Sequence, residues 1–486
     1  MSINKTTENS YILEDDEKDW DENIDVVIIG SGFAGLAAAI EAHNAGASVI
    51  ILEKMNAPGG NSIISDGGIA AAGTAMQKKL GIKDSPDLMY QDMLKAGLGL
   101  NYPDLVRVVT EKSNEVLQWS IDYLGVDYLD RIDIFGGHSV PRCYTPVGIS
   151  GSTIIKRQLL KLSELGIEVR TKTFFKNFVI DSAGRVYGII VREDYNYRDA
   201  DSGVNRCIRV KKAVVLATGG FSSDVSFRVT QDPRLTVKVD TTNKPFATSE
   251  ALKESLKIGA MPVQLSHIQL GPWASPDEKG YGVGPDFSDY IVFQYGLVVE
   301  PGTGKRFINE LADRKTVSDA ILNIGAPCIG IADAKAVETS GWNIEHCLEK
   351  GVVKSFNDLK ELASFYKLSY TALKVTVQKF NSYIENRLDK EFSKPILDDA
   401  SPINYPPYYG IRLWPKVHHT MGGIQINVRG QVIDINQKPI SGLYAAGEVV
   451  GGIHGACRLG SCAITDCLVF GRISGMNAAN ENIVLH

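Results

Sequence analysis

Three glycines near the start of the chain have the spacing that phosphate-binding turns use. Gly30, Gly32 and Gly35 form the pattern G-x-G-x-x-G, which follows a short apolar run and opens an alanine-rich stretch. In a strand–turn–helix context, such a turn lets a pyrophosphate approach the free N–H groups of a helix N-terminus. Glu53 ends the next apolar run, where a carboxylate can accept hydrogen bonds from a ribose diol. These residues predict a dinucleotide site.

Further glycine turns, far apart in the sequence, indicate which dinucleotide is bound. They lie at 58–62, 67–68, 217–220 and 442–448. Several distant turns around one extended ligand suit FAD better than NAD, and the alternative is a set of glycine turns with no ligand. From these segments we predict the following contacts to FAD: Gly30, Gly32, Ala34, Gly35, Glu53, Lys54, Asn61, Ser62, Gly67, Gly68 and Gly219.

Hydrophobic periodicity around these turns predicts alternating strands and helices. Strands are expected at 25–29, 48–53 and 213–217, with a hairpin at 179–191. Helices are expected at 33–45, 104–124, 152–166 and 461–479, and residues 312–390 are expected to be mostly helical. The strand–turn–helix pattern returns near the end of the chain. We therefore expect a nucleotide domain built from both ends of the chain, with a second domain inserted between them.

The composition is typical of a globular protein with more than one domain. The chain has 486 residues, a net charge of −6 and scattered Lys and Arg, which disfavours nucleic acid as a partner. Its seven cysteines are irregularly spaced, so we expect reduced thiols and no metal site. Residues 1–23 are polar and acidic, so we expect a disordered extension that is not a secretory signal. No apolar stretch is long enough for a membrane span, and we expect a cytoplasmic protein.

Three longer segments carry a resemblance to a known family. They are 306–314 (RFINELADR), 418–423 (HHTMGG) and 447–460 (GEVVGGIHGACRLG). With these segments the chain resembles the flavoproteins of the soluble fumarate reductase and urocanate reductase group, the flavocytochrome c family, from about residue 24 to 479. The resemblance implies an α/β fold. A Rossmann-type, glutathione-reductase-like FAD domain would be split into 24–262 and 415–486, and an α+β capping domain would be inserted at 263–414.

The resemblance also implies a reaction, the reduction of the C=C bond of a 2-enoate. Flavin N5 gives a hydride to one carbon, and the family's arginine acid, here Arg314, protonates the other. Arginine is a weak acid in water, so this role requires that water is excluded and that the acceptor is a strongly basic carbanion. Without the resemblance, a structural arginine paired with Glu310 or Asp313 is the simpler interpretation.

Other family roles fall on residues around this arginine. Arg458 and His418 match the clamp for the substrate carboxylate, because a guanidinium binds a carboxylate through two parallel hydrogen bonds. Ser461 is also expected to contact the substrate. The final helix begins near this residue, and its positive end would stabilise reduced flavin. Core or surface histidines are the alternative for His418 and His419. The resemblance adds these contacts to FAD: Glu250, His419, Glu448, Ala463 and Ile464. Glu250 lacks the glycines that flank the acid in the family.

Departures from the family pattern concern the substrate. Gly271 stands where fumarate reductases have a histidine for the second carboxylate, and Val292 replaces an arginine of the proton relay. Fumarate is therefore not expected to be the best substrate. The remaining relay and substrate positions fall on Ser288, Asp289, Tyr281 and Trp273. This region is similar to urocanate reductases, where an acid and an aromatic hydroxyl receive an imidazole, although another acrylate or plain packing of the aromatic rings would also fit.

Electron supply must come from outside the segments assigned so far. We find no haem domain, no motif for covalent FMN and no family motif for covalent FAD. We therefore expect non-covalent FAD, a small unsaturated carboxylate as substrate and a separate electron donor, either a flavin (FMN) or a cytochrome carrier. The alternatives are a dehydrogenase or oxidase on the same fold, of the 3-ketosteroid dehydrogenase or amino-acid oxidase type, and a non-enzymatic flavin electron-transfer subunit.

Overall fold

The first glycine turn joins strand β2 (Glu22–Ile29) to helix α1 (Phe33–Asn44) in a computed structural model that describes residues 11–12 and 19–481. The apolar residues of β2 are buried because parallel neighbours flank the strand on both sides. Val26 pairs with Val49 on one side and with Ala213 on the other. This is the βαβ unit that the sequence predicts.

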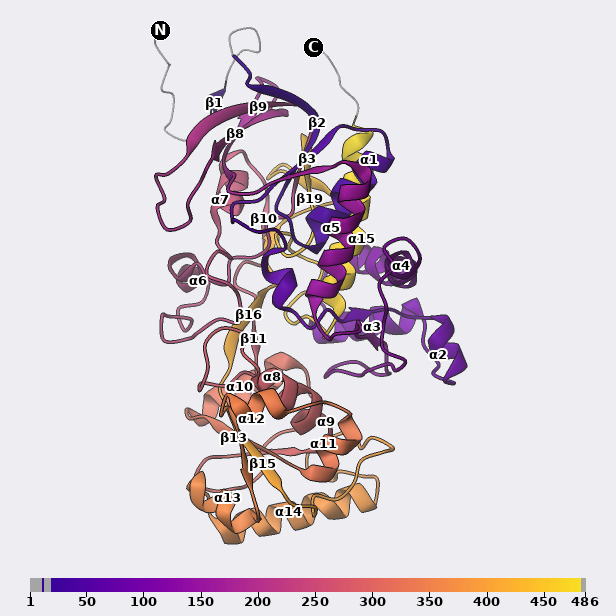
Figure 1. Cartoon of the computed structure of the whole chain (residues 1–486), viewed down its shortest axis with the longest axis vertical. Coiled ribbons are helices and arrows are strands. Elements are labelled where there is room, and N and C mark those ends of the chain that lie inside the picture. Colours follow the sequence, from indigo (N-terminus) through magenta and orange to yellow (C-terminus); the bar gives the residue numbers. More distant parts are fainter. Residues whose placement is uncertain (1–10, 13–18, 482–486) are drawn as a thin grey trace.

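The strand β2 lies inside a nine-stranded sheet at the top of Figure 1. Its parallel part is β19-β9-β2-β3-β6, and β7, β8 and the first half of β9 form an antiparallel meander. The other strands of this sheet are β1 (Tyr11–Ile12), β3 (Val49–Leu52), β6 (Glu168–Arg170), β7 (Phe174–Ile180), β8 (Val186–Glu193), β9 (Val204–Leu216), β18 (Gln431–Ile433) and β19 (Pro439–Ala445).

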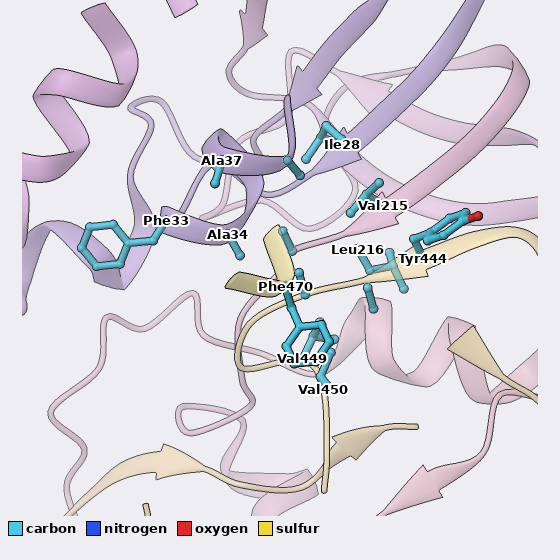
Figure 2. Packing of buried hydrophobic residues seen from close by; sticks show 14 of the residues in the cluster. Ile28, Phe33, Ala34, Ala37, Val215, Leu216, Tyr444, Val449, Val450 and Phe470 are labelled. Carbon is cyan, nitrogen blue, oxygen red and sulfur yellow. The ribbon is translucent and has the colours of Figure 1, made fainter. Parts of the chain in front are cut away.

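Helices α1 and α15 (Cys462–Ala479) pack closely against each other and against the sheet. A Cβ atom on Gly471 would lie 2.6 Å from Ala34 O, and one on Gly475 would lie 2.0 Å from Ala38 O. Small residues on both helices are therefore required at this contact. Figure 2 shows Ala34 of α1 near Phe470 of α15 in the core between them. The two ends of the chain thus share one core.

The other elements around this sheet are the long helices α4 (Pro103–Asp122) and α5 (Gly151–Leu165) and several short helices and strand pairs. The short ones are η2 (Gly60–Ile64), β4 (Ile69–Ala70) paired with β5 (Cys143–Tyr144), α2 (Ala75–Lys79), α3 (Pro86–Ala96), α6 (Val225–Gln231), α7 (Glu250–Lys257), and β10 (Pro262–Val263) paired with β17 (Gly423–Ile424). We call this whole assembly, built on the nine-stranded sheet, the nucleotide part.

A ribbon of two antiparallel strands, β11 (Ile268–Gly271) and β16 (Lys416–Thr420), leads out of the nucleotide part. The segment between them, residues 272–415, forms the lower body in Figure 1, and we call it the cap. It contains an antiparallel sheet of order β12-β13-β15-β14. Its elements are α8 (Gly284–Phe287), the π-helical turn η3 (Ser288–Val292), α9 (Phe293–Tyr295), β12 (Leu297–Val299), α10 (Arg314–Ile324), β13 (Cys328–Asp333), α11 (Ala334–Ser340), α12 (Glu345–Glu349), β14 (Val353–Phe356), α13 (Leu359–Phe365), α14 (Tyr370–Glu385) and β15 (Tyr408–Leu413).

The predicted helices at 33–45, 104–124, 152–166 and 461–479 are confirmed to within two residues. Residues 312–390 are mostly helical, as predicted, but also contain β13 and β14, which both pair with β15 in the cap sheet. No helix within 19–481 is both long and apolar enough to cross a membrane. The domain boundaries at 262/263 and 414/415 stay a prediction; they assign β11 to the capping domain and β16 to the FAD domain, although the two strands pair with each other.

The expectation of disorder for residues 1–23 is wrong for the part that the structure describes. Tyr11 pairs with Val179 in parallel register, and β2 already begins at Glu22. Between them, the Trp20 ring lies edge-on to Tyr187, over the space where Gly188 has no side chain. This contact partly buries the Trp20 ring, which the polar sequence around it did not suggest. Residues 1–10 and 13–18 lie outside the described residues.

Candidate functional site

Two connected cavities run along the edge where the strands of the nucleotide part end. The first is about 970 Å³ and the second about 820 Å³, both counted with the space that opens to solvent. The first lies over the glycine turn, and the second extends towards the cap. The residues that line both cavities are Phe33, Asn61, Ser62, Glu448 and Cys467. One elongated ligand can therefore pass from one cavity into the other.

The glycine turn is shaped by close backbone contacts. Gly30 has a φ of +103°, and a Cβ atom there would lie 2.3 Å from Ala217 O. A Cβ atom on Gly35 would lie 1.9 Å from Gly30 O, which only glycine avoids. Gly32 is the N-cap of α1, has no side chain of its own to cap the helix and lines the first cavity, while the Phe33 amide donates to Ser62 Oγ at 3.1 Å. The N-terminus of α1 can therefore accept a phosphate in the cavity.

Glu53 holds the turn in place while it faces the first cavity. Its Oε2 accepts hydrogen bonds from the Ser31 amide (3.3 Å) and hydroxyl (2.5 Å), and its Oε1 accepts one from the Met55 amide (2.9 Å). On the far wall, Lys54 Nζ donates to Thr248 Oγ1 (2.7 Å) and lies 3.3 Å from Glu250 Oε2. Ser31 and Thr248 are partners that the sequence pattern did not identify.

Most of the residues expected to contact FAD line these cavities. In the first lie Gly30, Gly32, Ala34, Glu53, Lys54, Asn61, Ser62, Gly219, Glu250 and Glu448. In the second lie Gly68, His419, Ala463 and Ile464, again with Asn61, Ser62 and Glu448. Gly35 and Gly67 line neither. Gly35 serves the helix–strand contact, and at Gly67 (φ +82°) a Cβ atom would lie 2.9 Å from Gly151 N. These residues suit a dinucleotide that carries an aromatic ring system into the second cavity.

Arg458 is one of two guanidinium groups in the second cavity. It is 5% exposed, and its Nη1 donates to Leu459 O at 2.9 Å while its Nε has no partner among the described residues. Burial, reinforced by the positive charge of Arg314, lowers the pKa of Arg458 to about 10. A buried cation with an unused N–H group is a binding site for an anion.

Arg314 is the second guanidinium group, and it begins α10 in the cap. Its Nη2 lies 3.6 Å from Asp289 Oδ2, its guanidinium carbon lies 5.6 Å from the Trp273 ring centroid, and its Nη1 has no partner within 19–481. Pairing with Glu310 or Asp313 is excluded by the structure. Glu310 binds Arg306 at 2.7 Å, and Asp313 caps α10 by accepting from backbone amides.

The two histidines are neutral. Burial lowers the pKa of His418 well below its usual value, and the charges of Arg314 and Arg458 act in the same direction. Its Nδ1 lies 2.8 Å from Thr242 Oγ1, and its ring meets Trp273 edge-on at 4.8 Å. Burial also lowers the pKa of His419, whose Nδ1 lies 3.6 Å from Glu448 Oε2. His418 therefore adds a hydrogen-bonding group to the cavity without adding charge.

The other residues expected to serve the substrate are only partly in this cavity. Tyr281 and Ser461 line it. Ser288 does not, because its hydroxyl is buried and donates to Trp273 O (2.6 Å) and Gly284 O (2.8 Å). Asp289 lies in a separate narrow cavity behind Arg314, where burial raises its pKa to about 6.

The sequence did not suggest Asp66, which also lines the second cavity. Its Oδ2 accepts from the Tyr290 hydroxyl at 2.7 Å and its Oδ1 accepts from Gly68 N at 3.1 Å. The only signal was its position just before the Gly67–Gly68 turn. The cavity thus has a carboxylate from the nucleotide part as well as its two guanidinium groups. No His, Cys, Asp and Glu side chains of the described residues form a group that could hold a metal ion.

Comparisons with known proteins agree with this arrangement. The sequence matches the family described as an FAD binding domain over residues 25–464. It is 43% identical to the acrylate reductase flavoprotein subunit of Shewanella woodyi over 459 residues, which cover 93% of this chain and 90% of that one. It is 33% identical to the urocanate reductase of Eggerthella lenta, over 94% of this chain and 75% of that one.

A comparison with a solved structure supports the same fold. The open conformation of a flavocytochrome c3 fumarate reductase is similar with a TM-score of 0.75 and 32% identity, over 95% of this chain and 79% of that one. The expected α/β fold of Rossmann type and the family resemblance are confirmed. The chain belongs to the flavoprotein family that is built on this FAD binding domain and includes these reductases, and it is an FAD-dependent oxidoreductase.

Proposed function

We propose that this protein reduces the C=C bond of a small 2-enoate that carries a single carboxylate, such as acrylate or a substituted acrylate. The observation that carries this proposal is the pair of buried guanidinium groups, Arg314 and Arg458. Both line one cavity, and each has an N–H group without a partner among the described residues. Two cations among neutral histidines favour an anionic substrate and disfavour a steroid or another neutral one.

In this proposal, Arg458 and His418 hold the substrate carboxylate. The guanidinium supplies the charge and the neutral imidazole supplies a hydrogen bond. His418 is kept in position by Thr242 and by the edge of Trp273. A carboxylate fixed in this way fixes the alkene as well, because the two groups are conjugated and planar.

Arg314 then donates the proton. Reduced FAD, when bound and after it has taken two electrons from the donor, would supply the hydride. Nη1 of Arg314 is free of partners in the described chain and belongs to a side chain that lines the cavity. Asp289, 3.6 Å away behind the guanidinium and with its pKa raised to about 6, is placed to return a proton to the arginine. Water must be scarce there, because an arginine loses a proton only to a strong base.

The same cavity argues against a dicarboxylate. A Cβ atom on Gly271 would lie 2.9 Å from the Trp273 ring, so Trp273 occupies the space that a histidine at 271 would use. Asp66 adds a carboxylate to the lining and would repel a second carboxylate of the substrate. Asp66 and the Tyr281 hydroxyl would accept a substituent that donates hydrogen bonds, such as an imidazole. The identity to an acrylate reductase and to a urocanate reductase supports this substrate class.

We further propose that FAD is bound without a covalent link and that a separate flavin or cytochrome carrier supplies the electrons. In the cavities, the Cys467 thiol is unreactive because burial raises its pKa well above the usual value. The relative from Shewanella woodyi is named as a flavoprotein subunit, which supports a separate donor. Acid precipitation should release all flavin into the supernatant, and protein-bound flavin in the pellet would contradict non-covalent binding.

The test of the reaction is anaerobic re-oxidation of the reduced protein, followed at the flavin absorbance band. The panel is acrylate, methacrylate, crotonate, cinnamate, urocanate and fumarate. We expect fast re-oxidation by at least one of the monocarboxylates and slow re-oxidation by fumarate. Fumarate as the best oxidant would refute the substrate assignment. Re-oxidation by oxygen or a quinone, with no response to any enoate, would favour a dehydrogenase, an oxidase or an electron-transfer subunit.

A further inference from the structure

We propose that Arg131, Trp342, Tyr290 and Asp66 form a latch that fastens the cap to the nucleotide part, and that Arg131 thereby acts as a positioning residue for Arg314. The structural claim stands on contacts alone. Its kinetic consequence rests on the proposed function.

The need for a latch follows from where the residues of the second cavity originate. Arg458 and Asp66 belong to the nucleotide part and His418 to the ribbon strand β16, whereas Arg314 and Tyr281 belong to the cap. The two parts are joined covalently only through the ribbon β11–β16, whose register shifts between Gln269 and Leu270. A two-stranded ribbon is a weak support by itself. Contacts beside the ribbon also join the two parts, such as the bond from Gly280 N to Asp240 Oδ2 (3.3 Å), and the latch adds an attachment at the outer end that helps to keep Arg314 at a fixed distance from Arg458.

Arg131 makes this attachment at the outer end. It lies in the loop between α4 and β5 of the nucleotide part, and Asp133 in the same loop holds its Nε at 3.1 Å. Its Nη1 donates to Ser340 O in the cap at 3.2 Å, and its guanidinium carbon lies 5.3 Å from the Trp342 ring centroid. In Figure 1 the ribbon lies on the left of the cap, and α11, which ends at Ser340, lies on the right.

The contact continues inward to the substrate cavity. The Trp342 ring stacks on Tyr290 with the centroids 3.5 Å apart and the planes 20° from parallel. The Tyr290 hydroxyl donates to Asp66 Oδ2 at 2.7 Å, and Asp66 lines the cavity. Trp342 and Tyr290 are 7% and 2% exposed. The two stacked rings are therefore shielded from water, whereas the Arg131 side chain above Trp342 is 33% exposed.

The chain of contacts therefore crosses between the two parts twice, at Arg131–Ser340 and at Tyr290–Asp66. With both crossings intact, the cap cannot turn about the ribbon without breaking a buried contact. We expect the loss of these crossings to let Arg314 shift relative to Arg458, although neither arginine is altered. Proton transfer requires close and oriented groups, and a displacement of about 1 Å can lower a rate a hundredfold.

The first experiment needs no substrate. Amide hydrogen exchange is measured on the full-length, FAD-loaded protein for wild type, Arg131→Ala, Arg131→Lys and Arg157→Ala. Arg157 is the matched control, because it pairs with Asp127 of the same loop at 3.9 Å. We expect several-fold faster exchange in peptides that cover 131–138 and 340–342 for Arg131→Ala. Arg157→Ala should match wild type, and Arg131→Lys should be intermediate because lysine keeps the charge and a donor.

The second experiment measures the two half-reactions. Arg131→Ala should slow re-oxidation by the best enoate about tenfold, the cost expected for one hydrogen bond and one cation–π contact, and leave FAD content and dithionite reduction unchanged. Tyr290→Phe keeps the stack and loses only the bond to Asp66, so it should slow re-oxidation less. Equal exchange in Arg131→Ala and Arg157→Ala would overturn the latch. Faster exchange in Arg131→Ala, in a protein that no enoate re-oxidises, would leave the latch standing and overturn the proposed function.

Discussion

Replacing Arg458 with methionine should make the protein more stable and less able to bind its substrate. The pKa of Arg458 falls to about 10, first because the side chain is buried and then because Arg314 is close. At pH 7 the group is nevertheless charged, so folding bears the full cost of burying the cation, about 3 kcal/mol. Methionine fills a similar volume without charge. It forfeits the bond to Leu459 O, about 1 kcal/mol, so a net gain of about 2 kcal/mol is expected.

Substrate binding should change in the opposite direction. The guanidinium can give a carboxylate two charge-assisted hydrogen bonds, each contributing about 1.5–3 kcal/mol. Losing both should raise the Kd of the enoate roughly a hundredfold to ten-thousandfold. The buried charge is thus a destabilising group that the substrate neutralises.

Two measurements on FAD-loaded protein check this reasoning. Urea unfolding at pH 7 gives the stability difference, and anaerobic titration with the best enoate gives the Kd. Arg458→Lys serves as a control, since it keeps the charge and loses the planar fork. A lower urea midpoint for Arg458→Met would show that the cation is satisfied in the resting protein. An unchanged Kd would show that the carboxylate binds elsewhere.

Three further outcomes follow from the geometry. Arg314→Ala should retain FAD and bind the enoate but lose turnover by several orders of magnitude. Single-turnover re-oxidation measures this loss. Equal and mild losses in Arg314→Ala and Arg458→Ala would contradict the separate roles of the two arginines. Gly30→Ala should lose FAD, because its Cβ atom would lie 2.3 Å from Ala217 O. The control Gly46→Ala should keep FAD, since Gly46 also has a positive φ but has nothing within 4 Å of a Cβ atom. The ratio of flavin to protein absorbance measures the FAD content of each variant. Burial raises the pKa of Glu448 to about 7 from its ordinary 4.5. The wild type should therefore lose up to about 3 kcal/mol of stability as pH rises from 4.5 through 7, while Glu448→Gln should not. The same dependence of unfolding free energy on pH in the two proteins would refute this prediction.

The cofactor half of the site could be predicted from the sequence. Gly30, Gly32 and Glu53 are recognisable because each acts within its own short segment, where a strand, a turn and a helix follow one another. The periodicities that mark these elements are local properties of the chain. Hydrophobic periodicity also predicted the helices on which this part is built. The prediction of disorder for the N-terminal residues failed at Trp20, because this ring packs against Tyr187, which is distant in sequence.

The substrate half depended on tertiary structure. From sequence spacing, either Glu310 or Asp313 could pair with Arg314. In the folded chain, Glu310 forms an ion pair with Arg306, and Asp313 is the N-cap residue of α10. Ser288 was expected in the cavity, yet its hydroxyl bonds backbone carbonyls beside it. Asp66 could not be assigned at all. Asp66 lines the cavity and binds Tyr290, which is 224 positions away in sequence, only when the cap folds against the nucleotide part. Which charges pair and which remain free for a ligand is set by burial and by neighbours distant in sequence, and these exist only in the folded chain.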